Sequence, residues 1–280
     1  MIRNLFIAAA AACVPAFAVT PVTSCGQILS TPGETYVLTA DVTCTAVTYV
    51  LTADVTCTAA QPVGLRVVAN DIVIDLQGFT LTGNGTGTGI LTAAMAGCVV
   101  AERLEVRNGT IQGFGTGIGL CVPGANPVST QSNIHNLAIR NSQAGVYLGN
   151  SSDNQVKNVT FDQINVAQAP ANPLITYRIG SAIYLDNSNN NKLQGNTITA
   201  SAANGIGIDH RSSDNEVRNN TITGSGASGI VIKVGAHDNL VRGNKATGST
   251  SSDLADDNVN CGTNDWLKNT FGTASQACIH

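Results

Sequence analysis

Two aspartates, a histidine and a lysine occupy related positions in a repeated segment of the chain. Asp186 and Asp209 each follow a short apolar alternation directly, and Lys233 follows the next alternation at the same offset. If these copies are adjacent turns of stacked strands, the backbones that carry the two aspartates lie about 4.8 Å apart. With His210 beside the second aspartate, the set contains the residue types of acid–base chemistry. We therefore take Asp186, Asp209, His210 and Lys233 as the candidate catalytic residues.

Three interpretations of this set remain open. In a glycoside hydrolase, Asp186 and Asp209 would be the acid and the base, and the backbone spacing allows both the inverting separation of roughly 6.5–9.5 Å and the retaining one of about 5–5.5 Å. In a polysaccharide lyase they would hold calcium, which takes roughly six to eight oxygen ligands, and Lys233 or Arg211 would be the base. In the third interpretation the side chains form a solvated charge ladder, in which Lys233 offsets both carboxylates.

Aromatic and basic side chains are expected on the same face. Tyr147 and Tyr184 occupy the neighbouring outward position of two copies, and Arg211 follows the histidine at a corner. A long loop that carries Tyr177 and Arg178 enters just before this face. Aromatic rings beside carboxylates suit sugar binding, because they are apolar with a polar handle. We predict that these five residues contact substrate.

The remaining histidines, His135, His237 and His280, are isolated in the sequence and are interpreted as surface residues. No metal site is predicted, apart from the calcium of the lyase interpretation, and no other cofactor is expected.

These positions recur because one unit is repeated between Ile183 and Ala246. Asn191, Asn215 and Asn239 begin successive copies at steps of 24 residues, and the apolar residues in each copy alternate. A period of two predicts strands. Because so short a copy cannot bury a hydrophobic face alone, neighbours must stack around a shared core. The repeat therefore predicts an all-β solenoid, a single-stranded parallel β-helix of about eight or nine coils.

Two columns of asparagine are predicted to form hydrogen-bonded ladders at the corners of the coils. Asparagine also tolerates the left-handed backbone that corners demand. One column contains Asn154, Asn191, Asn215, Asn239 and Asn264, and the other contains Asn196, Asn220, Asn244 and Asn269.

The chain divides into four predicted segments. Residues 1–18 form a signal peptide, 19–62 an N-terminal capping segment, 63–248 the coils, and 249–280 the last coil with a C-terminal cap. The capping segment contains a duplication, in which Thr35–Ala46 is repeated letter for letter 13 residues later. Ser249–Asn260 is acidic and is predicted to be irregular.

The N-terminus indicates export. Arg3 precedes an apolar run that is too short to span a bilayer, and Ala16–Ala18 has the small-x-small pattern of a cleavage site. We expect a secreted or periplasmic protein without a transmembrane segment. Lipid attachment at Cys13 is the disfavoured alternative, because the leucine of a lipoprotein site is missing.

Seven cysteines follow the predicted cleavage site, which fits an oxidising compartment. Cys25 is expected to pair with either Cys44 or Cys57, which the duplication makes equivalent, and to leave the other free. The two further predicted pairs are Cys98 with Cys121 and Cys261 with Cys278, so that disulfides clip both ends of the solenoid.

Charged residues make up 11% of the chain and the formal net charge is −4. Lysine and arginine form no cluster, which argues against nucleic acid as a partner.

Four segments together resemble secreted bacterial right-handed parallel β-helix repeat proteins of the pectin-lyase-like superfamily. They are CGQILSTPGETYVLTADVTC, VVANDIVIDLQGFTLTG, the NNTIT corners and the closing CGTNDWLKNTFGTASQAC. The resemblance covers nearly all of the chain after the signal segment and implies a right-handed β-helix. The superfamily includes polysaccharide lyases, polygalacturonases, epimerases and phage tail proteins, so the resemblance implies a fold more specifically than an activity.

The residues of the related polygalacturonases are matched only in part. Val231-Ile232-Lys233 is the nearest counterpart of their Arg-Ile-Lys, Gly-His-Gly is absent, and Asp256-Asp257 falls in the segment predicted to be irregular. We therefore predict a protein that interacts with a polysaccharide or cell-surface glycan, without an assigned catalytic activity. The alternatives are a polysaccharide lyase or glycoside hydrolase acting on acidic glycans, and a structural or adhesive cell-surface protein.

Overall fold

A computed structural model describes residues 19–22, 27–29, 35–38, 41–43, 53–57, 63–94, 97–98, 101–120, 129–165 and 179–280. Several predictions concern groups outside the described residues and side chains: the signal segment 1–18, Cys25, Cys44, Cys98, Cys121, Tyr177 and Arg178. Cys57 is buried and disulfide-bonded. Within the described residues, no helix has the length and apolar character needed to cross a membrane.

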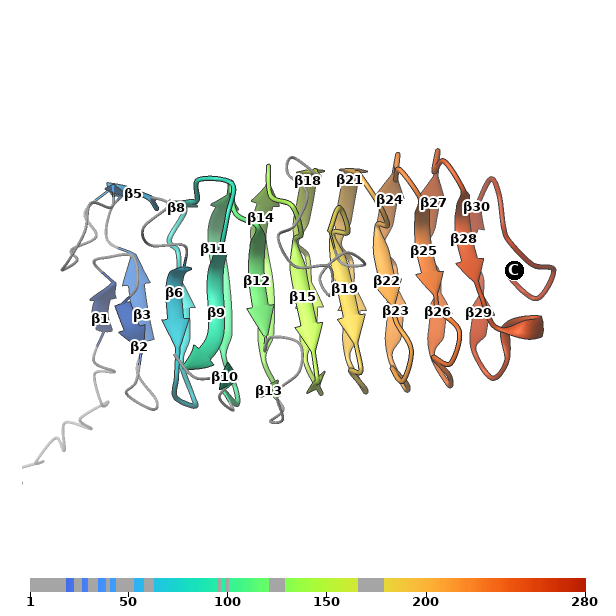
Figure 1. The fold of residues 1–280 in the computed structure, drawn as a ribbon, viewed down its shortest axis with the longest axis horizontal. Coiled ribbons are helices and arrows are strands. Elements are labelled where there is room, and N and C mark those ends of the chain that lie inside the picture. The colour runs from blue at the N-terminus through green and yellow to red at the C-terminus, as the bar shows by residue number, and fades with distance from the viewer. Residues whose placement is uncertain are drawn as a thin grey trace, which may run out of the picture.

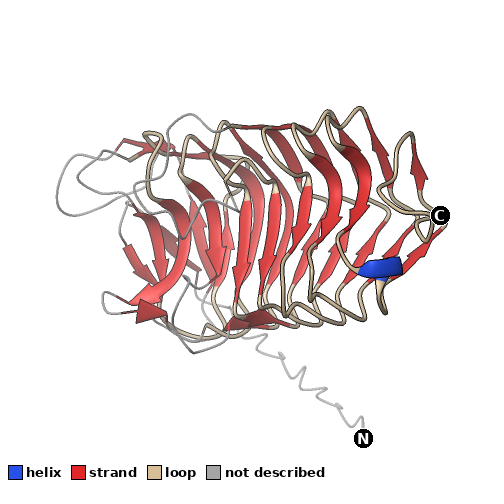
Figure 2. Ribbon diagram, turned by 45° about the vertical axis from the view of Figure 1, so that its right-hand side comes forward, coloured by secondary structure: helices blue, strands red, loops and turns tan. Residues whose placement is uncertain are grey.

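The described chain winds into a solenoid whose strands lie side by side along one long axis (Figure 1). Each regular coil has three strands. In one coil these are β19 (Ile183–Asp186), β20 (Lys192–Gln194) and β21 (Thr197–Ser201). The first strand joins a ten-stranded sheet and the other two join an eighteen-stranded sheet. Figure 2 shows the strands of successive coils stacked in these layers.

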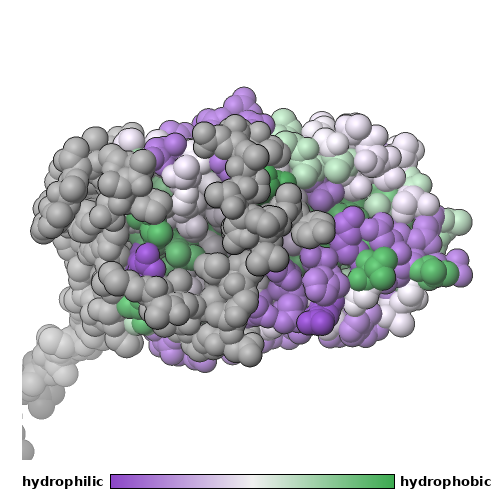
Figure 3. Space-filling model, viewed as in Figure 1, coloured by the Kyte–Doolittle hydropathy of each residue, from purple (hydrophilic) through white to green (hydrophobic). Residues whose placement is uncertain are grey.

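The ten-stranded sheet is parallel except where β10 meets β9. Its strands are β2 (Gln27–Leu29), β6 (Val63–Val67), β9 (Thr88–Ala94), β10 (Gly97–Cys98), β12 (Thr116–Leu120), β15 (Val146–Gly149), β19, β22 (Ile206–Ile208), β25 (Ser228–Ile232) and β28 (Ser252–Asp256). On its outer side, hydrophilic residues gather over the lower ends of β19 and β22 (Figure 3).

The eighteen-stranded sheet is parallel in every described pairing. Before the regular coils it contains β1 (Val19–Val22), β3 (Thr35–Leu38), β4 (Asp41–Thr43), β5 (Ala53–Thr56), β7 (Val73–Asp75), β8 (Thr80–Thr82), β11 (Glu105–Gln112), β14 (Asn133–Arg140), β17 (Gln155–Lys157) and β18 (Thr160–Ile164). It continues with β20, β21, β23 (Glu216–Arg218), β24 (Thr221–Thr223), β26 (Leu240–Arg242), β27 (Lys245–Thr247), β29 (Asp265–Leu267) and β30 (Thr270–Phe271). A small separate sheet joins β13 (Ser129–Thr130) to β16 (Ser151–Ser152), and Val259–Cys261 forms a 3-10 helix.

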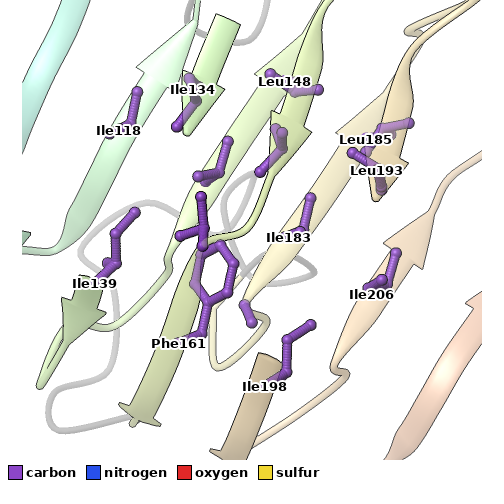
Figure 4. Close-up of a cluster of buried hydrophobic side chains, with 14 of the residues drawn as sticks. Ile118, Ile134, Ile139, Leu148, Phe161, Ile183, Leu185, Leu193, Ile198 and Ile206 are labelled. Carbon is purple, nitrogen blue, oxygen red and sulfur yellow. The ribbon is translucent and has the colours of Figure 1, made fainter. Parts of the chain in front are cut away.

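The core consists of apolar columns that run along the axis. Ile183 pairs with Ile206, which pairs with Ile230, and all three are fully buried. Phe161, Leu185 and Ile198 belong to the same cluster (Figure 4). Burying one such side chain contributes roughly 1.5–3 kcal/mol. The alternation of the sequence therefore sets which residues face inward, and the 24-residue step sets the register.

Both predicted asparagine ladders are confirmed. Asn191 donates from Nδ2 to Asn215 Oδ1 at 3.0 Å, and Asn215 donates to Asn239 Oδ1 at 2.9 Å. The second ladder links Asn196 and Asn220 in the same way at 2.9 Å. The left-handed residues are not the ladder asparagines but their predecessors, such as Asn190, Asp214 and Asn219. An asparagine that follows a left-handed residue turns its amide into the coil, where the next coil meets it.

The solenoid is slightly shorter than predicted. Seven steps separate β6 from β28, which gives about seven complete turns instead of eight or nine. The higher number counts partial turns at the two ends, where strands join the sheets without completing a coil.

The prediction that Ser249–Asn260 is irregular is wrong. β28 lies within it and pairs with β25 in register, from Ser228 with Ser252 to Ile232 with Asp256. The acidic composition misleads because Asp253 and Asp256 are 3% and 1% exposed. Both carboxylates are satisfied by the C-terminal cap, so a buried acidic residue is compatible with a regular strand here.

The C-terminal cap covers the last coil. Asp256 accepts a hydrogen bond from Trp266 Nε1 at 3.0 Å, and Trp266 is 1% exposed. Asp253 accepts hydrogen bonds from the backbone N–H groups of Gly272 and Thr273. The predicted disulfide between Cys261 and Cys278 is present. The predicted cap therefore exists, and its carboxylates tie the tail to β28.

Candidate functional site

The outward column predicted on the ten-stranded sheet is confirmed. Tyr147 pairs with Tyr184, Tyr184 with Gly207, and Gly207 with Val231. The next outward position holds Asp186, which pairs with Gly149. The strand β19 therefore presents an aromatic residue and an aspartate two residues apart, beside their counterparts on the adjacent coils.

Each tyrosine orients the aspartate of the following coil. Tyr147 donates from its hydroxyl to Asp186 Oδ2 at 2.8 Å, and Tyr184 donates to Asp209 Oδ2 at 2.7 Å. Both tyrosines are buried, with exposures of 1% and 3%. Burial, and then the hydrogen bond to Asp209, raises the pKa of Tyr184 well above its usual range. The tyrosines therefore stay neutral donors, and direct contact of their rings with substrate stays a prediction.

The ring of Tyr184 needs the glycine of the next coil. A Cβ atom at Gly207 would lie 2.7 Å from Cδ2 of Tyr184. The ring leans across this position and brings its hydroxyl to Asp209. A larger residue at 207 would displace the ring and break the pair.

Asp186, Asp209 and His210 come together as predicted. One ligand atom of each lies within 4.8 Å of the others. His210 Nδ1 lies 3.2 Å from Asp209 Oδ1, and the side chains are 54% and 17% exposed. The imidazole is therefore open to solvent, while the carboxylate behind it is held from two sides.

Calcium fits this cluster poorly. Each of the two carboxylates already accepts a tyrosine hydroxyl, and Asp209 also accepts the backbone N–H of His210. Calcium takes roughly six to eight oxygen ligands, which the described side chains at this point do not supply.

Lys233 is not the counterion of the two aspartates. Its Nζ lies 3.0 Å from Asp257 Oδ2, and the two side chains are 40% and 39% exposed. The predicted ladder in which Lys233 offsets Asp186 and Asp209 is therefore wrong. The cause is β28, whose regular pairing carries Asp257 to the coil directly beyond Lys233. Arg211 occupies the predicted corner, is exposed, and has a left-handed backbone with φ 61°.

An open groove that was not predicted adjoins this cluster. It has a volume of about 380 Å³ and lies over the last coils of the ten-stranded sheet. Among its lining residues are Tyr184, Val231, Lys233 and Asp257. A signal exists in the sequence: small residues recur 24 apart, as in Ser228 and Ser252. A column of small outward residues leaves a depression that larger neighbours frame.

The interpretation of His135 as an isolated surface residue is wrong. Its Nε2 lies 3.0 Å from Glu105 Oε1, and its side chain is only 14% exposed. Glu105 also pairs with Arg107, which pairs with Asp75 at 2.8 Å. Burial opposes ionisation of Glu105, but the hydrogen bonds from His135 and Arg107 outweigh it and lower the pKa. Parallel pairing of β7, β11 and β14 brings these residues together from distant segments, so sequence spacing hides them.

The other two histidines match their interpretation. His237 and His280 are exposed, and each bonds within its own corner or tail, to Asp238 and to the carbonyl of Cys278.

Comparison with known proteins identifies the family. The model of the right-handed β-helix region matches residues 80–271, and the chain belongs to this family. No curated protein sequence matches the chain.

Solved structures share the fold at low sequence identity. The tailspike protein of Escherichia coli bacteriophage HK620, in complex with a pentasaccharide, is 13% identical with a TM-score of 0.53. The match covers 87% of this chain and 43% of the tailspike, so the chain spans less than half of that protein. An alginate lyase from Paenibacillus is 15% identical with a TM-score of 0.45, covering 88% of this chain and 93% of the lyase. A periplasmic alginate epimerase is 13% identical with a TM-score of 0.42, covering 87% of this chain and 71% of the epimerase.

Proposed function

We propose that this protein binds a polysaccharide on the outer face of its ten-stranded sheet, at Asp186, Asp209 and His210. The observation that carries the proposal is the pair of buried tyrosines, each of which fixes the carboxylate of the next coil. Oriented carboxylates at an open surface suit hydrogen bonding to sugar hydroxyls. The shared fold with a pentasaccharide-bound tailspike agrees with this proposal at the level of architecture.

Export belongs to the same proposal. The signal-like residues 1–18, the cysteines and the disulfide of the cap are consistent with a secreted or periplasmic protein that meets glycans outside the cytoplasm.

A glycan array with the full chain tests the binding proposal. We expect binding to at least one polysaccharide class, and loss of roughly tenfold or more in affinity for Asp209→Asn, since a hydrogen bond to a charged group is worth about 1.5–3 kcal/mol. Asp265→Asn, on an exposed strand of the other sheet, is the matched control and should bind as the wild type does. Absence of binding to every glycan would leave the structural or adhesive role.

A catalytic role for the same residues is the second candidate. The nearest ligand atoms of Asp186 and Asp209 lie within 4.8 Å, which is on the side of a retaining glycosidase rather than an inverting one. Incubation with bound glycans, followed by product analysis, tests this role. A lyase would also produce unsaturated ends that absorb in the ultraviolet, with and without added calcium.

A further inference from the structure

We infer that the ligand of this face is an uncharged glycan, and that it runs from the aspartates along the solenoid axis into the groove over the last coils. The inference rests on the proposed function and adds the ligand class and the path of the chain. It departs from the acidic glycans considered in the sequence analysis.

The groove has an apolar floor. Val231 and Ala255 are paired on adjacent coils and both line it. They are 2% and 6% exposed, so the floor is shallow and well packed. A flat apolar strip of this kind suits the C–H face of a sugar ring, as small-molecule sites combine apolar surface with few polar groups. Tyr184 lines the end nearest Asp209, which joins the groove to the aspartate cluster.

One side of the groove is lined with neutral hydrogen-bonding groups. Ser251 is exposed and Ser252 is half-buried, and neither hydroxyl bonds to a described residue. Asn204 extends the same row by one coil and accepts the backbone N–H of Ser228 at 3.2 Å. Hydroxyls and an amide can both donate to and accept from sugar hydroxyls.

The opposite side offers no net charge. Lys233 is the only cation and Asp257 the only anion among the groove's described lining residues, and they are bonded to each other at 3.0 Å. A ligand carboxylate could be recognised by Lys233 only by displacing Asp257. Beyond the end of the groove lie two further carboxylates, Asp186 and Asp209, which repel a polyanion. Arg211 is the only other cation at this corner and is not among the lining residues.

The path of the ligand follows from the register. The floor residues and the serine row both repeat at steps of one coil, so the groove runs parallel to the axis. The same direction connects Val231 through Gly207 to Tyr184. A glycan on this path crosses successive coils about 4.8 Å apart.

Calorimetric titration of the full chain tests the ligand class. The probes are uncharged gluco- and manno-hexasaccharides, an oligogalacturonate and an oligomannuronate of equal length, and a glucosamine hexamer. We expect an uncharged probe to bind at least about fivefold more tightly than every acidic or basic probe, the scale of one exposed charge pair.

Two variants test the groove. Ser252→Phe places a ring in it and should lower affinity for the uncharged probe by about tenfold or more. Asp257→Asn frees Lys233 and should raise affinity for the acidic probes by about two- to fivefold. Thr223→Phe adds the same ring to an exposed position of the other sheet and should have no effect. Ser251→Tyr, at the exposed rim, replaces Ser252→Phe if thermal unfolding shows that variant to be misfolded.

The outcomes separate the two proposals. No binding of any glycan to the wild type overturns both. Tighter binding of an acidic or basic probe, or full affinity in the folded groove variants, overturns this inference alone and leaves binding at the aspartates standing.

Discussion

Tyr184 ties the stability of the site to its geometry. The ring is 3% exposed, and its hydroxyl reaches Asp209 one coil away. The glycine at 207 makes room for the ring, so three residues on two coils act together. A hydrogen bond between a buried hydroxyl and a carboxylate both stabilises the fold and fixes the direction of the carboxylate.

The ionisation of Tyr184 predicts an alkaline loss of stability. Its folded pKa is raised, first by burial and then by Asp209, whereas an unfolded tyrosine titrates near about 10. The neutral hydroxyl therefore contributes fully below that pH, and its contribution falls as the pH rises above it.

Urea unfolding between about pH 8 and pH 11 measures this effect. Wild type should lose more unfolding free energy over this range than Tyr184→Phe, which at neutral pH should be less stable by roughly 0.5–1.5 kcal/mol. Equal slopes for the two proteins would mean that Tyr184 does not carry the effect.

At the scale of single elements, the corner ladders hold the coils in register. Asn215 Oδ1 accepts both the backbone N–H and the Nδ2 group of Asn191, at 2.9 and 3.0 Å. Its own Nδ2 donates to Asn239 and to the carbonyl of Ser188. A substitution thus leaves buried donors and acceptors on two neighbouring coils without partners.

Asn215→Ala should therefore cost about 3–5 kcal/mol of unfolding free energy, since each unsatisfied buried group costs roughly 1–3 kcal/mol. Asn219→Gly is the matched control. Asn219 is exposed, has φ 54°, and shares its corner column with Gly195 and Gly243. Glycine adopts this conformation freely, so the control should change stability by only a few tenths of a kcal/mol. Chemical denaturation of the two variants decides the matter.

At the scale of the whole molecule, the cap decides how the core ends. Asp253 is 3% exposed and its strand, β28, forms the last rung of the ten-stranded sheet. Burial alone would raise the pKa of Asp253, but hydrogen bonds from the N–H groups of Ser249, Gly272 and Thr273 outweigh it and lower the pKa. The carboxylate thus holds the tail over the open end of the core.

This predicts an acid-sensitive cap. Because the folded pKa is depressed, the stabilisation is present above the unfolded value of about 3.9 and is lost as the pH falls through the lower folded value. Asp253→Asn should be less stable than wild type by about 1–3 kcal/mol at pH 7. The gap should narrow towards pH 2. A gap of constant size at both pH values would contradict the prediction; thermal unfolding at each pH measures it.

The sequence predicts repetition well and long-range pairing badly. Ile183, Ile206 and Ile230, and the asparagines beside them, follow from a constant step, because equal spacing stacks equal positions. The Tyr184 column and the Asp186–Asp209 neighbourhood follow from the same rule. The partner of Lys233 does not, because it required β28 to be regular in spite of two buried aspartates.

Two further features were beyond reach for a physical reason. The burial of Tyr147 and Tyr184 depends on ring rotamers and on what covers the sheet, which alternation does not specify. The contact between His135 and Glu105 joins residues 30 apart in a region where the coils differ in length, so no single period predicts it. Regular coils are thus predictable residue by residue, and irregular ones only as strands.

The direction of the backbone hydrogen bonds has a mechanical consequence. In every regular coil these bonds link one turn to the next, so they point along the long axis of the molecule. Tension applied along that axis loads all the bonds between two turns at once, whereas tension applied to one end of the chain peels them in sequence. The ladders of Asn191 and Asn196 add side-chain bonds in the same direction. The molecule is therefore built to resist stretching as a rod and to yield by unwinding from its ends, which makes the locked tail at Cys261 and Cys278 its anchor against a pulling force.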